Sequence, residues 1–326
     1  MARNSESSST LKPVDSFEVP RFSGLATFIR APFQPNAEGL DIAFVGVPFD
    51  FGTNRGGTRH GPSQVRDMSR LIRRFNSDGA DSPFDICNVA DVGDAPFNPL
   101  DPKTSVWAIA DYFERLADLG VVPISCGGDH GAAYPAMKGT ARNGPVGLVH
   151  FDAHPDSYHA IYGDRYNHGT LISRGVEEAI IDPARTISIG IRGTRFALDD
   201  RDFNKKHDMR LIDYDEYEAL GRAKVIEEIH RVVGEGPVYV TFDIDALDSS
   251  FCPGTGSPEP GGLSMRDAQM LIRSLGDLDI IGADVCEIAP ALDQQGVTAL
   301  NAANLMFELC CVAAKACVRR KARAAK

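Results

Sequence analysis

The sequence predicts an α/β fold in which a mostly parallel sheet is covered by helices on both faces. Short apolar segments typical of strands alternate along the chain with segments of helical periodicity, as they do in parallel βαβ units. The strand segments are apolar at nearly every position instead of every second one, which indicates that both faces of the sheet are buried. Three of these segments are followed directly by acidic and histidine residues.

The individual elements can be assigned in order. The strand candidates are residues 42–47, 121–126, 146–151, 186–191, 209–212, 238–242 and 280–285. The helical patterns are residues 61–73, 106–119, 215–233, 264–274 and 297–315. Glycine and proline are spread among short loops and no linker interrupts the pattern, so we predict a single domain over residues 21–326. Residues 1–20 are polar and rich in serine, and we expect a flexible N-terminal segment there.

The composition is that of an ordinary soluble globular protein. The chain has 326 residues, 43% hydrophobic and 24% charged, with a formal net charge of −11. We predict no nucleic-acid partner because no basic face is evident. We predict no membrane contact because no apolar run approaches the ~20 residues of a bilayer span. The N-terminus lacks an apolar signal core, so the cytoplasm is the expected location. The seven cysteines form no Cys-x-x-Cys pair, which argues against a zinc ribbon or a disulfide framework.

Metal-ligand side chains follow three of the predicted strands. Within HFDAHPD, at 150–156, they stand at alternate positions, and in an extended segment such side chains point the same way. Because the carboxyl ends of parallel strands meet at one edge of a sheet, all three groups should converge there. The candidates are Asp152, His154 and Asp156 in HFDAHPD, Asp243 and Asp245 in TFDIDALD, and Asp129 and His130 in CGGDH.

These side chains predict a metal centre. A single aspartate after a strand is most often a helix cap or a turn residue, but that explanation has to cover two histidines and, besides Asp129, four aspartates at once. Burying so much like charge without a cation would cost many kcal/mol. Oxygen-rich ligation disfavours structural zinc and favours manganese, with nickel or cobalt as alternatives. Four carboxylates carry more charge than one divalent ion balances, so we predict two ions that share carboxylates and hold hydroxide at neutral pH.

Taken together, the motifs resemble the ureohydrolase family, which includes arginase and agmatinase. The similarity covers about residues 40–310 in the family's order and includes GGDH, DAHPD, TFDIDALD, RHGP, NHGT, PGTGSPEPGGLS and DVCEIAP. It implies a three-layer α/β/α sandwich around an eight-stranded sheet, in trimers or hexamers. The RGTR segment at 192–195 is similar to the agmatinase branch. The residues with which arginase recognises an α-amino acid are not evident.

The resemblance also implies how the metal ligands are shared and which residues act on the substrate. One ion would be held by His130, Asp152, Asp156 and Asp243, and the other by Asp152, His154, Asp243 and Asp245. His168, in NHGT, falls at the family's proton-transfer histidine. Glu287, in DVCEIAP, falls at the carboxylate that binds the guanidinium through charge-assisted hydrogen bonds.

Three departures from the family's pattern bear on the substrate, and one is that the GTNRGGTRHGP segment is one residue shorter than usual. Pro155 stands inside the metal motif where relatives have a small or hydroxyl residue, and proline fixes its own φ and removes an amide donor. Residues 157–167 occupy the stretch that contacts the substrate's tail, and they differ from the usual residues. Within that stretch His159 and Arg165 are candidate tail-binding residues, since Arg165 could pair with a carboxylate.

The implied activity is hydrolysis of a small guanidino compound to urea and an amine by attack of a metal-bridging hydroxide. Agmatine, a guanidino acid, guanidine and a substituted guanidine or biguanide are the candidate substrates. One alternative is a related C–N hydrolase with formiminoglutamate- or deacetylase-like activity. Another is a supporting subunit in a hetero-oligomer with a paralogue, although such a subunit would have no physical need for the complete set of ligands.

Overall fold

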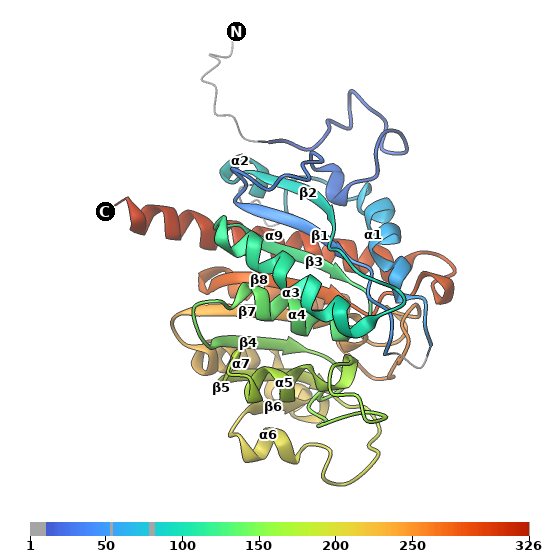
Figure 1. The fold of residues 1–326 in the computed structure, drawn as a ribbon, viewed down its shortest axis with the longest axis vertical. Helices are drawn as coiled ribbons and strands as arrows, with labels where there is room; N and C mark the ends of the chain where they lie inside the picture. The colour runs from blue at the N-terminus through green and yellow to red at the C-terminus, as the bar shows by residue number, and fades with distance from the viewer. Residues whose placement is uncertain (1–10, 53–54, 78–81, 326) are drawn as a thin grey trace.

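The computed structural model describes residues 11–52, 55–77 and 82–325. Its centre is a sheet of eight strands, all parallel, in the order β2-β1-β3-β8-β7-β4-β5-β6 (Figure 1). The strands are β1 (Ile42–Val47), β2 (Val89–Asp94), β3 (Val122–Gly127), β4 (Val146–Phe151), β5 (Ile181–Ile191), β6 (Arg210–Asp213), β7 (Pro237–Asp243) and β8 (Asp279–Cys286). The predicted α/β sandwich is therefore confirmed.

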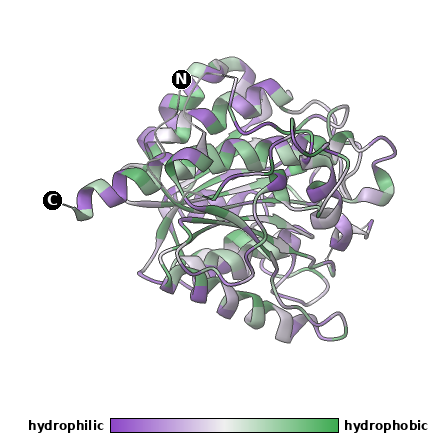
Figure 2. Ribbon diagram, turned by 90° about the horizontal axis from the view of Figure 1, so that it is seen from above, coloured by the Kyte–Doolittle hydropathy of each residue, from purple (hydrophilic) through white to green (hydrophobic). Residues whose placement is uncertain are grey.

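Helices cover both faces of the sheet and turn their hydrophobic sides toward it (Figure 2). One layer consists of α3 (Pro102–Asp118), α4 (Ala133–Thr140) and α5 (Leu171–Glu177). The opposite layer consists of α1 (Gly61–Ser69), α7 (Tyr214–Val233), α8 (Met265–Ser274) and α9 (Val297–Ala324). The short helices α2 (Pro83–Ile86) and α6 (Asp202–Lys206) lie at the two ends of the sheet (Figure 1).

The sheet separates two hydrophobic cores, and most strands contribute to both. In β1, Ile42 and Phe44 belong to the core under α1 and α9, whereas Ala43 and Val45 belong to the core under α3 and α4. Successive side chains of a strand point to opposite faces, so a strand between two helix layers is apolar at most positions. This arrangement explains the continuous apolar runs in the sequence.

Several elements lie outside the predicted set. Strand β2 was not predicted because Asp91 and Asp94 interrupt its apolar pattern. Asp91 is nevertheless buried, because the Arg66 guanidinium pairs with it at 2.9 Å and the Phe28 amide donates to it. Helix α4 contains Gly139, where an added Cβ would stand 2.3 Å from the Ala110 carbonyl, so the glycine permits close packing against α3.

Helix α9 changes one expectation from the sequence. By length and composition it could cross a membrane, so the statement that no apolar run approaches a bilayer span was wrong. However, 78% of its most apolar window is buried inside the protein. Burial in the core accounts for this hydrophobicity, as it does for a core helix that is apolar all round. All seven cysteines are buried, and Cys87 lies against α9, with its thiol 3.7 Å from the Ala314 carbonyl oxygen.

The proposed flexible segment, residues 1–20, lies partly outside the described residues. Within the described part, the Arg30 guanidinium donates hydrogen bonds to the Ser16 hydroxyl and the Val19 carbonyl. The flexibility of this segment and the boundary at residue 21 remain predictions.

Candidate metal centre and active site

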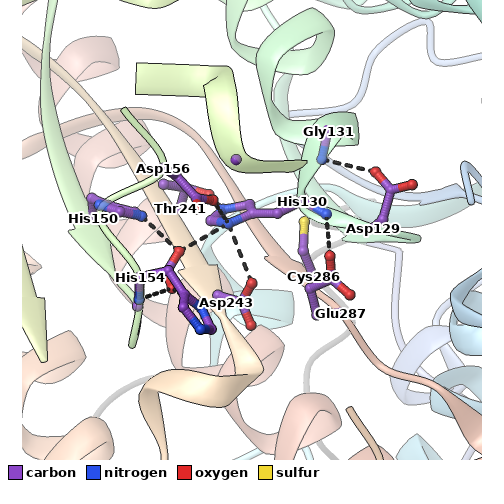
Figure 3. A network of polar contacts seen from close by, with 12 residues as sticks. Asp129, His130, Gly131, His150, His154, Asp156, Thr241, Asp243, Cys286 and Glu287 are labelled. Carbon is purple, nitrogen blue, oxygen red and sulfur yellow. Dashed lines mark hydrogen bonds and ion pairs between the residues drawn. The ribbon is translucent and has the colours of Figure 1, made fainter. Parts of the chain in front are cut away.

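The predicted metal ligands meet at the carboxyl ends of four neighbouring strands (Figure 3). The order β3-β8-β7-β4 places these strands side by side, so the loops that follow them share one edge of the sheet. His130 follows β3, and Glu287 follows β8. Asp243 ends β7 with Asp245 two residues later, and the three ligands of HFDAHPD follow β4.

The first group of ligands surrounds His130. Its Nδ1 lies 3.0 Å from Asp152 Oδ2, 2.9 Å from Asp156 Oδ2 and 3.3 Å from Asp243 Oδ2. All four side chains are buried. Burial lowers the pKa of the imidazole, but hydrogen bonds to the three carboxylates raise it well above the usual value. The three carboxylates therefore strongly favour a positive charge at the position that they surround, next to His130 Nδ1.

The second group surrounds His154. Its Nδ1 lies 3.1 Å from Asp245 Oδ2 and 3.4 Å from Asp152 Oδ1, and its side chain is 26% exposed. Asp152 thus belongs to both groups, with Oδ2 facing His130 and Oδ1 facing His154. A carboxylate shared in this way is suited to bridge two cations.

The electrostatics of the aspartates support the same conclusion. Burial and the neighbouring charges of Asp245 and Asp152 raise the pKa of Asp243 well above its usual value. Burial also raises the pKa of Asp245. The pKa of Asp152 is held well below its usual value although burial raises it, because three histidines hydrogen-bond to it. Oxygen-rich donors with two imidazoles, crowded together and buried, fit a pair of divalent ions.

Backbone groups hold these carboxylates in place. The His154 amide donates to Asp152 Oδ1 at 2.6 Å, the Ala153 amide to Asp245 Oδ1 at 3.1 Å, and the Asp245 amide to Asp243 Oδ1 at 2.9 Å. Asp156, after Pro155, has a φ of 44°. Such a conformation is rare for a residue other than glycine and is found where function requires it.

His168 lies at the start of a short 3₁₀ turn, His168–Thr170, against two glycines. A Cβ at Gly52 would stand 2.6 Å from His168 Nδ1, and a Cβ at Gly131 would stand 3.2 Å from its backbone nitrogen. Asp129 binds the same loops, since its carboxylate accepts from the amides of Phe51, Gly52 and Gly131. Asp129 therefore organises the loops around His168, and its carboxylate is not among the groups around His130 and His154.

Glu287 is buried beside the first group. Its Oε1 accepts a hydrogen bond from the His130 amide at 2.8 Å, and its Oε2 is buried without a partner among the described residues. Burial and the charges of Asp243 and Asp129 raise the pKa of its carboxyl group well above the usual range. A buried carboxylate oxygen without a partner is suited to a cationic ligand.

The structure brings His159 and Arg165 together with Glu177. Arg165, 48% exposed, pairs with Glu177 Oε2 at 2.6 Å, and His159 Nδ1, on a side chain 75% exposed, lies 3.6 Å from Glu177 Oε1. His159 also lines an open cleft of about 780 Å³ with Ser157, Tyr158 and α6. Their contact with a substrate's tail stays a prediction.

Sequence reasoning missed several groups that contact the ligands. His150 Nε2 lies 2.9 Å from Asp152 Oδ2, Thr241 Oγ1 lies 2.8 Å from His130 Nε2, and Glu259 Oε1 lies 3.7 Å from His154 Nε2. His150 could have been noticed, since it stands two residues before Asp152 in the same motif. Glu259 could not, because the loop that carries it is placed by contacts distant in sequence: the Arg192 guanidinium donates to its carbonyl.

Comparison with known proteins agrees with this geometry. The sequence matches the arginase family over residues 40–311. It is 44% identical over 310 residues to guanidinopropionase of Pseudomonas aeruginosa, covering 94% of this chain and 98% of that protein. It is 42% identical over 296 residues to mitochondrial agmatinase of Gallus gallus, covering 90% and 87%. The solved structure of proclavaminate amidino hydrolase from Streptomyces clavuligerus superposes with a TM-score of 0.88 at 38% identity, covering 91% and 99%. The chain therefore belongs to the arginase family of C–N hydrolases, in its agmatinase-like branch.

Proposed function

We propose that this protein hydrolyses a small guanidino compound to urea and an amine at a centre of two divalent ions. The observation that carries the proposal is the carboxylate of Asp152, which lies between the His130 group and the His154 group and faces each with a different oxygen. The similarity to guanidinopropionase supports the guanidino group as the part of the substrate that is recognised.

The residues of the site divide the chemical work between them. His130, Asp152 and Asp156 would hold one ion with Asp243, while His154 and Asp245 would complete the second position. When bound, a pair of divalent ions supplies an activated water at neutral pH and stabilises the charge that develops during attack on the guanidinium carbon.

Glu287 would bind the substrate's guanidinium. Its buried Oε2, which has no partner among the described residues, would accept an N–H of the cation in a charge-assisted hydrogen bond and orient the carbon toward the ligands. His168, at the edge of the site with its Nδ1 buried, would deliver the proton that the leaving amine needs. Loss of the amine without a proton would be unfavourable, because an amide anion is a very poor leaving group.

We further propose manganese as the metal, with nickel or cobalt as alternatives, on the strength of the oxygen-rich ligand set. The substrate's tail would meet residues 157–167, where His159 and Arg165 are the candidates. A cytoplasmic location, assembly into homotrimers or homohexamers, a possible hetero-oligomer with a paralogue, and the absence of nucleic-acid and membrane partners complete the proposal.

Urea release by the purified chain alone is the direct test. Metal-free protein would be loaded in parallel with manganese, nickel and cobalt and assayed against agmatine, 4-guanidinobutyrate, 3-guanidinopropionate, guanidine and a biguanide. We expect urea from at least one of them. Hydrolysis of formiminoglutamate without urea from any guanidine would replace the proposal by the related C–N hydrolase. Activity that appears only with a paralogue present would assign the chain a supporting role.

A further inference from the structure

A row of buried polar side chains crosses the sheet beneath the metal centre. The strand registers pair its members directly from one strand to the next, and each is no more than 1% exposed. Their neighbours in sequence, such as Val149 and Val240, point into the core under α9, so the row faces the layer of α3, α4 and α5. The row consists of Ser188 on β5, His150 on β4, Thr241 on β7, Asp284 on β8 and Ser125 on β3.

Polar groups at such a depth are costly unless they are hydrogen-bonded. An apolar residue at each position would continue the packing seen elsewhere along these strands. The hydrogen bonds of the row therefore indicate its role. Two sets of them lead to predicted metal ligands, one to His130 and one to Asp152.

The first arm runs from Asp284 through Thr241 to His130. The Thr241 hydroxyl donates to Asp284 Oδ1 at 2.7 Å, which leaves its oxygen to accept from His130 Nε2 at 2.8 Å. A histidine whose Nε2 carries the proton presents the lone pair of Nδ1. Nδ1 is the atom that faces the three carboxylates of the first group. The arm therefore selects the tautomer that can bind a cation there.

The second arm runs from Ser188 through His150 to Asp152. His150 Nε2 lies 2.9 Å from Asp152 Oδ2, and an ionised carboxylate can only accept, so this nitrogen is the donor. His150 Nδ1 lies 3.0 Å from the Ser188 hydroxyl, which fixes the other side of the ring. Both ring nitrogens are thus engaged, and His150 orients the shared carboxylate without being a ligand itself.

We propose that these two arms form a positioning layer that holds the metal ligands, and that they act on different parts of the centre. The Asp284–Thr241 arm supports His130 and hence only the first ion. The Ser188–His150 arm supports Asp152 and hence both ions. This inference rests on the proposed two-metal function. Ser125 continues the row but donates to the Ala283 carbonyl and touches no ligand.

Calorimetric titration of manganese into metal-stripped protein tests the difference between the arms. Thr241→Val keeps the shape of the side chain and removes its hydroxyl, so we expect one of the two sites to weaken by about 10–100-fold, the usual effect of losing such support. Thr241→Ser should restore that site. If Thr241→Val does not fold, Asp284→Leu breaks the same arm at the other end, because leucine is of similar size and has no acceptor for the Thr241 hydroxyl.

The second arm has its own matched pair of variants. His150→Gln places an amide nitrogen close to the position of Nε2 and should keep much of the affinity, whereas the shorter His150→Asn should weaken both sites by about 10–100-fold. Ser125→Ala is the control for disturbing the buried row, and it should leave both affinities unchanged.

The outcomes separate this inference from the proposed function. Two ions in the wild type with unchanged affinities in Thr241→Val and His150→Asn would overturn the positioning layer alone. A single ion in the wild type would overturn the two-metal centre and the distinction between the arms with it. Two ions without urea release would overturn the proposed function, while the affinities would still decide the roles of the arms.

Discussion

Glu287 carries two unfavourable features at once. Its φ of 67° is in the left-handed region, and its Oε2 is buried without a partner among the described residues. Each such feature costs on the order of 1–3 kcal/mol. A residue that only filled space would relieve both by substitution, so the carboxylate's position is explained best by a ligand that it binds.

Glu287→Gln should therefore separate activity from stability. The variant keeps the size of the side chain but loses its charge, so kcat/KM for every guanidino substrate should fall by the equivalent of about 2–5 kcal/mol. The melting temperature of the metal-free protein should stay the same or rise, because the buried charge is gone. Activity close to that of the wild type would show that another group binds the guanidinium.

His168→Ala should lower turnover by about two to four orders of magnitude, the usual effect of losing a general acid. The manganese content should not change, since His168 does not contact the metal ligands in either group. Gly52→Ala offers a second route to the same effect, because the added Cβ would displace the ring of His168. Equal turnover in His168→Ala would assign the proton to another residue, such as His159.

The ligands should differ in how many ions depend on them. Asp152→Ala, like Asp243→Ala, should release both ions or leave one loosely held, whereas Asp156→Ala should weaken only the ion of the first group, because the Asp156 carboxylate lies against His130. Metal analysis after dialysis measures the stoichiometry. One ion per saturated wild-type chain with full activity would contradict the two-metal centre.

At the scale of elements, we predict that the 157–167 loop determines which substrate tail is accepted. Arg165 already pairs with Glu177 at a half-exposed site, and such pairs contribute under about 1 kcal/mol. A carboxylate tail would have to draw Arg165 away from this pair. If Arg165 binds such a tail, as proposed, Arg165→Ala should lower kcat/KM for 4-guanidinobutyrate alone by the equivalent of about 2 kcal/mol or more. Small and equal changes for 4-guanidinobutyrate, agmatine and guanidine would remove Arg165 from the site. Glu177→Gln is the companion variant, since it would free Arg165 for that contact.

The strands that carry the ligands could be predicted from the sequence because their signals are local. HFDAHPD places three ligands directly after an apolar run, and β4 ends at the expected residue, Phe151. Strand β2 could not be predicted, since Asp91 is acceptable inside it through contacts with Arg66 and the Phe28 amide, which depend on the whole fold. Short helices such as α4, which contains Pro135 and Gly139, are likewise stabilised by packing and have little helical propensity of their own.

The polar row beneath the metal centre could not be predicted from the sequence either. Thr241, Asp284 and Ser188 each look like an isolated polar residue within an apolar run. Only the strand order, which places β7 between β8 and β4, brings them into one line with His150. Sequence alone contains no local signal for that order, because neighbouring strands such as β4 and β7 are far apart in the chain.

On the scale of the whole molecule, metal binding and folding should be linked. The buried carboxylates of the centre repel one another, and any ligand that binds only the folded state stabilises it. Manganese at about 100 times its dissociation constant should add about 2.7 kcal/mol per independent site and raise the melting temperature of chelator-treated protein. Asp152→Ala should show much less of this shift. Identical melting curves for the chelated and loaded wild type would contradict the linkage.

The buried cysteine thiols can be used to measure how often each region of the protein opens. Cys87 and Cys310 lie in the core that α9 covers, while Cys252 and Cys286 lie close to the ligand-bearing strand ends. An alkylating reagent can reach a thiol only when the surrounding segment separates from its neighbours, and segments of one protein open with different free energies. Mass spectrometry of the alkylated chain over time would therefore rank its regions by how often they open, with no probe introduced.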